Sequence, residues 1–157
     1  MFKYPMYFQT ECSTQSGVQK TWVVTSKTSQ NNWTATCAVP PEFNGPGGGF
    51  SPEDLFAQAL TNCFVATFKV YAENSKLDYE NLSAESVLTV DLDENKKPIM
   101  KKLKLLVSVL NPSNQDIAEL LAKKAFQSGF ILNSVKTEIE FEYNKNEFFK
   151  NKIISKK

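Results

Sequence analysis

The sequence contains no histidine and no arginine, because all 18 of its basic residues are lysine. Without histidine, the chain cannot build a Ser–His–Asp triad, a Cys–His pair or a histidine-containing zinc site from its own residues. Without arginine, it has no guanidinium group to bind a phosphate or carboxylate through two parallel hydrogen bonds. Proton transfer and nucleophilic chemistry must therefore use Asp, Glu, Lys, Tyr or Cys side chains.

Strong charge and long apolar runs are also missing. The formal net charge is only +1, so the chain as a whole has no field that would attract nucleic acid or anionic lipid. No apolar run approaches the roughly 20 residues of a membrane-spanning helix, and the N-terminal MFKYPMYFQTE does not resemble a secretion signal. We therefore expect a cytoplasmic protein that binds neither nucleic acid nor a membrane.

Cysteine is sparse, with residues only at Cys12, Cys37 and Cys63 and no CxxC spacing. Such an odd, scattered set fits neither a secreted disulfide framework nor a zinc site. We expect these thiols to stay mostly reduced, and the sequence predicts no metal and no cofactor.

The 157 residues fit a single domain whose N-terminal part, residues 1–39, is a β meander. Aromatic and β-branched residues cluster there in three segments that are separated by polar turns. The three predicted strands are Met6–Gln9, Thr21–Lys27 and Trp33–Val39. Residues 40–50, PPEFNGPGGGF, hold too many prolines and glycines for a helix or a strand interior and are predicted to form an ordered or a flexible loop.

Residues 51–74 are predicted to form a long helix. Ser51 is a good N-cap, Pro52 suits the first helical position, and Glu53 and Asp54 place negative charge in the first turn. Asp54 also lies three residues after Ser51, as in a capping box. The apolar positions form one wide stripe, which predicts that the helix is central to the domain. These positions are Leu55, Phe56, Ala59, Leu60, Cys63, Phe64, Thr67 and Phe68.

The second half of the chain, residues 84–143, is predicted to contain a hairpin, a second helix and a last strand. Alternating apolar residues predict hairpin strands at 84–92 and 99–110, and an amphipathic pattern predicts a helix over 114–128 with Gly129 as its C′ residue. Strict alternation predicts a strand over 134–143, and residues 144–157 form a basic tail. The order βββ–α–ββ–α–β, with strands joined by short turns, predicts an α+β fold with largely antiparallel sheets.

Cys63 is the candidate for chemistry, and two interpretations of it are open. It lies on the apolar stripe of the long helix, where a cysteine is commonly an inert core residue. A reactive thiol instead requires a positive neighbour or a hydrogen bond that holds the thiolate. Phe50, Phe56 and Phe64, close to Cys63 in the sequence, are candidates for lining an apolar pocket.

Residues 40–64, PPEFNGPGGGFSPEDLFAQALTNCF, resemble the signature of the OsmC/Ohr family of osmotically inducible and organic hydroperoxide resistance proteins. In that family, a Gly-rich loop is followed by Asn/Ser-Pro-Glu-x-Leu, which opens a long helix, and by Cys-Phe ten residues after the Glu. SPEDL at residues 51–55 and CF at residues 63–64 match this pattern in register. The resemblance implies antiparallel sheets wrapped around central helices in an intertwined homodimer with active sites at the subunit interface.

The resemblance also implies a mechanism. A peroxidatic Cys, matched by Cys63, attacks an organic hydroperoxide, and a second Cys captures the resulting sulfenic acid. An external dithiol such as dihydrolipoamide then reduces the disulfide. An Arg near the N-terminal strands stabilises the thiolate, and a Glu at the helix start, matched by Glu53, holds that Arg. Because Glu53 and Cys63 are ten residues apart, roughly 15 Å along one helix, a shared site needs a bridging cation or a Glu from the other subunit.

Two positions depart from the family pattern. Aligning the segment that follows the second helix places Gly129 where the family has its second Cys, and the chain has no Arg. Lys20, in the N-terminal region, is a candidate for supplying the positive charge, and its other interpretation is a solvated surface residue. Cys37 and Cys12 are candidates for an alternative resolving thiol, and an external thiol could also resolve the sulfenic acid.

The sequence therefore supports hypotheses of different classes. The first is thiol-dependent reduction of organic hydroperoxides through Cys63 in antioxidant defence, with an external thiol as reductant. The second is a non-catalytic OsmC-like dimer that binds a small apolar ligand, and a third is an interaction or structural dimer without pocket chemistry. The family match favours the first hypothesis, and the missing Arg and second Cys favour the second.

Overall fold

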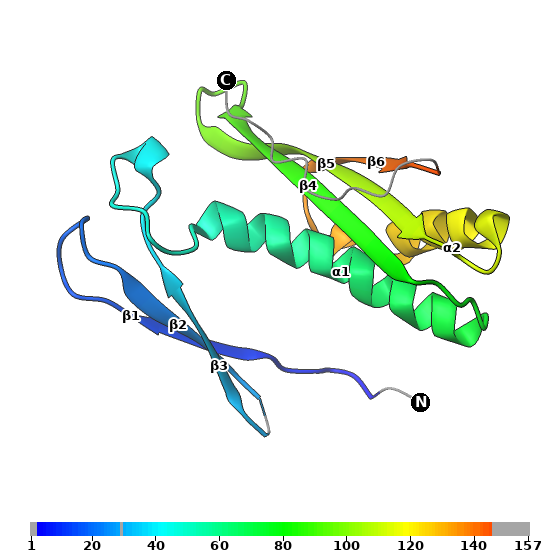
Figure 1. Ribbon diagram of the computed structural model, residues 1–157. Coiled ribbons are helices and arrows are strands. Elements are labelled where there is room, and N and C mark those ends of the chain that lie inside the picture. Colours follow the sequence, from blue (N-terminus) through cyan, green and yellow to red (C-terminus); the bar gives the residue numbers. More distant parts are fainter. Residues whose placement is uncertain (1–2, 29, 146–157) are drawn as a thin grey trace. The chain divides into compact units, whose positions relative to one another are not determined.

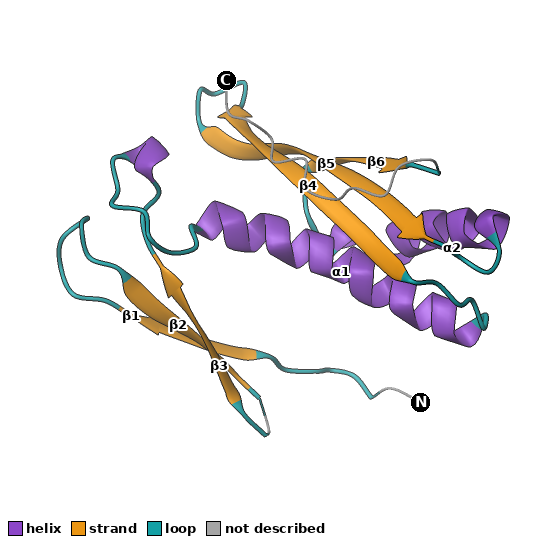
Figure 2. Ribbon diagram, viewed as in Figure 1, coloured by secondary structure: helices purple, strands orange, loops and turns teal. Residues whose placement is uncertain are grey.

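The computed structural model describes residues 3–28 and 30–145, and in it the chain forms two compact units. The first unit ends at Leu55 and the second begins at Phe56. The predicted basic tail, residues 144–157, lies outside the described residues beyond Lys145. Figure 1 colours the elements by their order in the sequence, and Figure 2 colours them as helices and strands.

The first unit contains a three-stranded antiparallel sheet in the order β1-β2-β3. Its strands are β1 (Gln9–Ser13), β2 (Trp22–Lys27) and β3 (Asn32–Cys37), in agreement with the predicted meander. The prediction of a strand at Met6–Gln9 was wrong by several residues, because cross-strand pairing with β2 begins only at Gln9, opposite Lys27. The residues of β1 are all exposed, so their apolar pattern carried little information about the strand.

The loop after β3 is ordered by hydrogen bonds to that strand and to the residues that directly follow it. The backbone N–H of Phe50 donates to Thr36 O at 2.9 Å, and the N–H of Gly47 donates to Val39 O at 3.2 Å. A Cβ at Gly45 would lie only 2.0 Å from Val39 O, so only glycine allows this close approach. Of the two predicted alternatives, the ordered loop is therefore correct. It includes a short 3-10 helix, η1 (Pro41–Phe43).

The second unit is built from a sheet in the order β4-β5-β6 and from helices packed against it (Figure 1). The helix α1 (Pro52–Asn74) begins at the end of the first unit and continues into the second. The other elements are β4 (Asn81–Leu92), β5 (Pro98–Leu110), α2 (Gln115–Ser128), the 3-10 helix η2 (Leu132–Ser134) and β6 (Glu138–Tyr143).

The strand pairing in this second sheet differs in one respect from the predicted antiparallel arrangement. β4 and β5 form the predicted antiparallel hairpin, but β6 pairs with β5 in parallel. A parallel neighbour requires a crossover connection, and the chain between β5 and β6 supplies one in α2. The last strand is also shorter than the predicted segment 134–143, because pairing with β5 begins only at Glu138, opposite Lys102.

The core of the second unit lies between one face of this sheet and the two helices. Leu103, Leu105 and Val107 of β5 alternate with Lys102 and Lys104, so that each of the three is fully buried. On the opposite face, Lys102 pairs with Glu140, and Lys104 pairs with Glu142 at 2.9 Å. The α+β class predicted from the sequence is thus confirmed, with apolar residues inward and ion pairs outward.

Aromatic rings connect α1 to the sheet and to α2. The Phe64 ring lies 6.2 Å from that of Phe68 and 5.7 Å from that of Phe141. Phe141 of β6 also stacks on Phe126 of α2 at 4.8 Å. Because these rings fill the layer between helices and sheet, they fix the rotation of α1 about its axis and hence the direction of each of its side chains.

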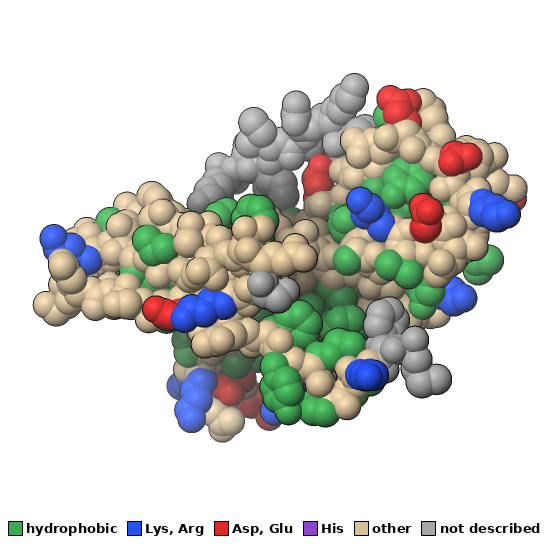
Figure 3. All heavy atoms as spheres, turned by 90° about the horizontal axis from the view of Figure 1, so that it is seen from below, with side chains coloured by type: hydrophobic (Ala, Val, Ile, Leu, Met, Phe, Trp, Pro, Cys, Tyr) green, Lys and Arg blue, Asp and Glu red, His purple; other side chains and the backbone are tan. Residues whose placement is uncertain are grey.

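The two units differ in how much apolar surface they bury. Several large apolar side chains of the first unit are exposed, including Trp33 at 67% and Val23 at 51%, and Figure 3 shows hydrophobic side chains at the molecular surface.

None of the helices in the described part of the chain has both the length and the apolar character that crossing a membrane requires.

Candidate redox site

The start of α1 is fixed by the predicted capping box. The backbone N–H of Asp54 donates to Ser51 Oγ at 3.0 Å, and the N–H of Ser51 donates to Asp54 Oδ2 at 2.9 Å. These reciprocal bonds satisfy two donors that would otherwise lack partners at the helix start. They also fix the residue at which the helix begins.

Cys63 lies on the face of α1 that enters the core of the second unit. The residue is 6% exposed, and its neighbours along the same face, Leu60, Phe64 and Phe68, are fully buried or nearly so. The Thr67 hydroxyl donates to the carbonyl oxygen of Cys63 at 2.7 Å, within the helix. Among the residues that the structure describes, the Cys63 thiol itself has no hydrogen-bond partner.

Gly129, just after α2, lies beside the Cys63 sulfur. A Cβ added at Gly129 would be 3.2 Å from Cys63 Sγ, 3.3 Å from Ala125 O and 2.8 Å from Leu132 Cδ1. The backbone at Gly129 has φ −61° and ψ 112°, which any residue can adopt. The sequence predicted Gly129 as the C′ residue, but it is the C-cap residue, directly after Ser128, and its backbone N–H donates to Ala125 O. Glycine at 129 therefore avoids close contacts and does not serve a special backbone conformation.

One hydrogen bond and one cation–π contact hold the end of α2 against α1. The Tyr71 hydroxyl of α1 donates to Ser128 Oγ at 2.8 Å, and Lys124 lies over the Tyr71 ring at 4.9 Å from its centroid. Following the helix, the N–H of Asn133 donates to Gly129 O at 3.0 Å. The position of residue 129 next to Cys63 is thus a fixed feature of the packing between the two helices.

Glu53 and Lys20 belong to the first unit, and the structure does not join them. Glu53 is half-buried, and its Oε2 is a buried oxygen with no hydrogen-bond partner among the described residues. Lys20 is exposed, and its backbone N–H donates to Gly17 O at 3.0 Å. The ion pairs within the described part of the chain do not include either side chain.

The other two cysteines also belong to the first unit. Cys12 is exposed on β1, whereas Cys37, at the end of β3, is 1% exposed. Burial raises the pKa of the Cys37 thiol, and the nearby Cys12 adds to the shift. Since a thiol reacts as its thiolate, this environment lowers the reactivity of Cys37. No cluster of three or more Cys, Asp or Glu side chains suited to a metal ion occurs within residues 3–28 and 30–145.

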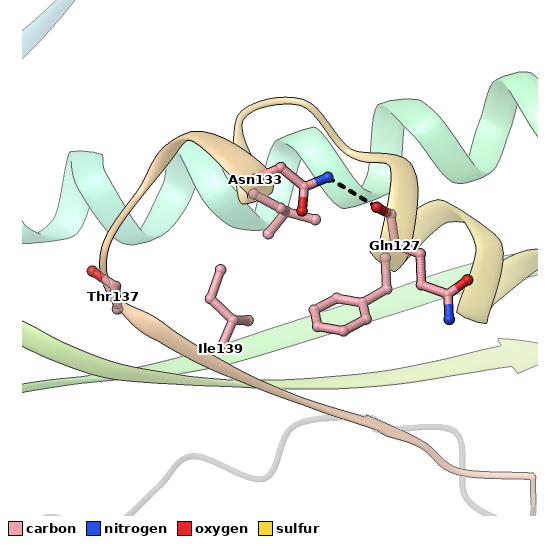
Figure 4. A pocket seen from close by; sticks show the side chains of 6 residues that line it. Gln127, Asn133, Thr137 and Ile139 are labelled. Carbon is pink, nitrogen blue, oxygen red and sulfur yellow. Dashed lines mark hydrogen bonds between the residues drawn. The ribbon is translucent and has the colours of Figure 1, made fainter.

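A pocket of about 340 Å³ opens between the end of α2, η2 and the start of β6. Figure 4 shows Gln127, Asn133, Thr137 and Ile139 around it, with the Asn133 amide donating to Gln127 O at 2.9 Å. Phe126 and Leu132 complete its lining.

The sequence analysis did not find this pocket, because its residues come from three elements and carry no motif. Phe50, Phe56 and Phe64, the residues proposed from the sequence, do not line it. Phe64 is fully buried in the core, and Phe50 is 46% exposed in the first unit.

Comparison with known proteins identifies the family. Residues 45–144 match the family model described as OsmC-like protein. The uncharacterized protein YmaD of Bacillus subtilis (strain 168) is 27% identical over 115 residues, which cover 71% of this chain and 77% of that protein.

Solved structures share the fold. An OsmC-like protein of unknown function from Vibrio cholerae superimposes with a TM-score of 0.77 at 16% identity, covering 89% of this chain and all of that one. An organic hydroperoxide resistance protein OsmC from Legionella pneumophila gives a TM-score of 0.67 at 22% identity, covering 92% of this chain and all of that one. The match of the family model over most of the chain shows that this protein belongs to the OsmC-like family.

Proposed function

We propose that this protein reduces organic hydroperoxides with Cys63 as the attacking thiol, as part of a peroxide or stress response. Its family supports this role, and so do fold neighbours named as organic hydroperoxide resistance proteins. One observation carries the proposal to Cys63. Residue 129 is the position that the family resemblance pairs with the second cysteine. A Cβ at this position would lie 3.2 Å from Cys63 Sγ.

The proposed reaction is a two-electron reduction of the peroxide bond. The Cys63 thiolate attacks one oxygen of ROOH, the O–O bond breaks, and the other oxygen leaves as RO⁻, which takes a proton to become the alcohol. Cys63 is thereby oxidised to sulfenic acid, Cys–SOH. Two equivalents of an external thiol return it to Cys–SH, releasing water. The chain needs no metal or other cofactor for these steps.

The charge around the site is proposed to be completed in a homodimer. The exposed apolar residues of the β1-β2-β3 sheet, such as Trp33, provide surface for a second copy. The buried Oε2 of Glu53 has no partner among the described residues, and a cation from the other subunit would satisfy it. Lys20 is the candidate, because a lysine can supply the point charge that the family takes from Arg.

The dimer is tested by changing Trp33 to Lys and measuring mass by light scattering after size-exclusion chromatography. We expect the parent protein to elute as a dimer and Trp33→Lys to shift toward monomer, because a charge would replace buried apolar surface. A parent protein that is monomeric at all concentrations would contradict the proposal.

A second candidate function is non-catalytic binding of a small, largely apolar ligand. The pocket next to Leu132 favours it, as does a Cys63 that is 6% exposed among apolar side chains. In this case peroxides would not be consumed, and a ligand would raise the melting temperature without oxidising Cys63.

The deciding experiment is a peroxidase assay with cumene hydroperoxide, run with dihydrolipoamide and with monothiols. We expect turnover in the parent protein and in Cys12→Ser, and a fall to the buffer rate in Cys63→Ser. Cys12→Ser is the matched control because it removes a thiol that is exposed. Equal turnover by the parent and Cys63→Ser would refute the proposed chemistry.

A further inference from the structure

Cys63 is the only cysteine of the second unit. The chain has three cysteines in all, and Cys12 and Cys37 both lie in the first unit. Of these two, Cys37 is 1% exposed and pairs with neighbours within its own sheet and loop. A sulfenic acid at Cys63 therefore has no second thiol within its own compact unit with which to condense.

The position where such a thiol would stand is occupied by a residue without a side chain. Gly129 lies beside Cys63 Sγ and has no side chain, although its backbone conformation would accept one. The atom nearest to the point that a Cβ of residue 129 would occupy is Cδ1 of Leu132, at 2.8 Å. The end of a leucine side chain can change rotamer, so this contact can give way to an incoming group.

Leu132 also forms part of the pocket between α2, η2 and β6. Leu132 therefore both lines the pocket and lies against the position beside the sulfur that a side chain of residue 129 would occupy. The pocket is within the size range of small-molecule sites, and its polar lining consists of the Gln127 and Asn133 amides and the Thr137 hydroxyl (Figure 4). None of its lining residues carries a charge. The lining thus suits a small molecule with neutral amide or hydroxyl groups.

We propose that Cys63 works in a one-cysteine cycle with a neutral low-molecular-weight monothiol. The monothiol binds in this pocket and, when the Leu132 side chain moves aside, reaches the Cys63 sulfur next to Gly129. The inference rests on the proposed peroxidase function. The thiol R′SH attacks the sulfur of Cys63–SOH, forms Cys63–S–S–R′ and releases water. A second R′SH attacks the R′ sulfur of this mixed disulfide, so that Cys63–SH is regenerated and R′S–SR′ leaves. The two electrons taken by the peroxide are thus supplied by two monothiol molecules.

The test uses the double variant Cys12→Ser/Cys37→Ser, in which Cys63 is the only cysteine. The protein is oxidised with one equivalent of cumene hydroperoxide and then mixed with N-acetylcysteine amide or with the anionic N-acetylcysteine at equal thiolate concentration. Intact mass spectrometry follows the mixed disulfide, and dimedone trapping follows the sulfenic acid separately.

We expect the double variant to keep turnover within about 3-fold of the parent and to form the mixed disulfide at Cys63. The neutral thiol should react faster than the anionic one. A dimedone adduct without any mixed disulfide would overturn the one-cysteine cycle alone. So would a disulfide between Cys63 and Cys12 or Cys37 in the oxidised parent, if the double variant then lost turnover. No dimedone adduct at all would instead overturn the proposed peroxidase function.

The binding site of the thiol is tested by Thr137→Val, which lies just before β6, with Thr89→Val at an exposed position of β4 as the matched control. We expect Thr137→Val to raise the thiol concentration needed for half-maximal mixed-disulfide formation at least 3-fold while leaving the rate of sulfenic acid formation unchanged. The same thiol dependence in Thr137→Val and Thr89→Val would overturn the pocket as the site of binding.

Discussion

A cysteine introduced at position 129 should form a disulfide with Cys63. The Cβ of residue 129 would lie 3.2 Å from Cys63 Sγ, which is compatible with an S–S bond of about 2.05 Å and a Cβ–Cβ distance of about 3.8 Å. Both residues belong to the second unit, so the prediction depends only on packing inside that unit. The backbone at 129 already has dihedral angles that a cysteine can adopt.

The expected gain in stability follows from the loop that the bond would close. This loop contains roughly 66 residues, and the chain-entropy model gives about 4 kcal/mol for restricting the unfolded chain to that extent. For a chain of this size, 1 kcal/mol corresponds to about 2–4 °C in melting temperature. We therefore expect oxidised Gly129→Cys to melt about 8–16 °C above the same variant in reduced form.

The assay combines diamide oxidation of Gly129→Cys, made in the Cys12→Ser/Cys37→Ser background, with thermal denaturation monitored by circular dichroism. Peptide mapping without reductant identifies the bond, and the background protein without the new cysteine is the control, whose melting temperature should not change on oxidation. If Cys63 and the introduced thiol both remain free to react with maleimide after oxidation, the described packing of Gly129 against Cys63 is wrong.

Three other predictions test the surroundings of the site. Ser51→Ala should lower the free energy of unfolding by about 1 kcal/mol, measured by urea denaturation, because it removes the bond from Asp54 N–H; no change would contradict the capping role. Cys37 should react with maleimide more slowly than Cys12, because Cys37 is buried, and equal labelling rates would contradict this. The labelling rate of Cys37 should still increase above the pH at which an ordinary thiol is fully ionised, because burial raises the pKa of its thiol. Hydrogen bonds from Lys123 and then Lys145 lower the pKa of Glu119, so the stability it contributes is complete above the ordinary value of 4.5 and is lost as pH falls through the lowered one. Glu119→Gln should therefore flatten the fall in urea midpoint on acidification below about pH 5 at low salt, and an unchanged pH profile would contradict the ion pairs.

The long helix and its neighbours were predictable because their signals are local. The Ser51 to Asp54 capping box and the apolar stripe through Leu60 and Phe64 both lie within one segment of sequence, and both were confirmed. The position of β1 was not predictable in the same way, because its exposed residues are placed by pairing with β2. The parallel pairing of β6 likewise depends on the path of α2 across the sheet.

The site was predictable only in part for a similar reason. The motif made Cys63 the candidate, and the family resemblance placed residue 129 at the position of the second cysteine, but neither reveals how closely residue 129 packs beside the Cys63 sulfur. That packing also involves Leu132, which comes near Gly129 through the fold of α2 and η2. The pocket was missed because no local pattern joins Phe126 to Thr137 and Ile139.

The most direct test of the central claim is the rate at which Cys63 itself is oxidised. The double variant Cys12→Ser/Cys37→Ser is mixed with increasing cumene hydroperoxide in the presence of dimedone, and intact mass spectrometry follows the adduct. The account predicts one dimedone adduct per chain, at Cys63, with a rate that rises in proportion to the peroxide concentration. A Cys63 thiol that stays unmodified in the folded protein, but reacts once the protein is unfolded in urea, would contradict it.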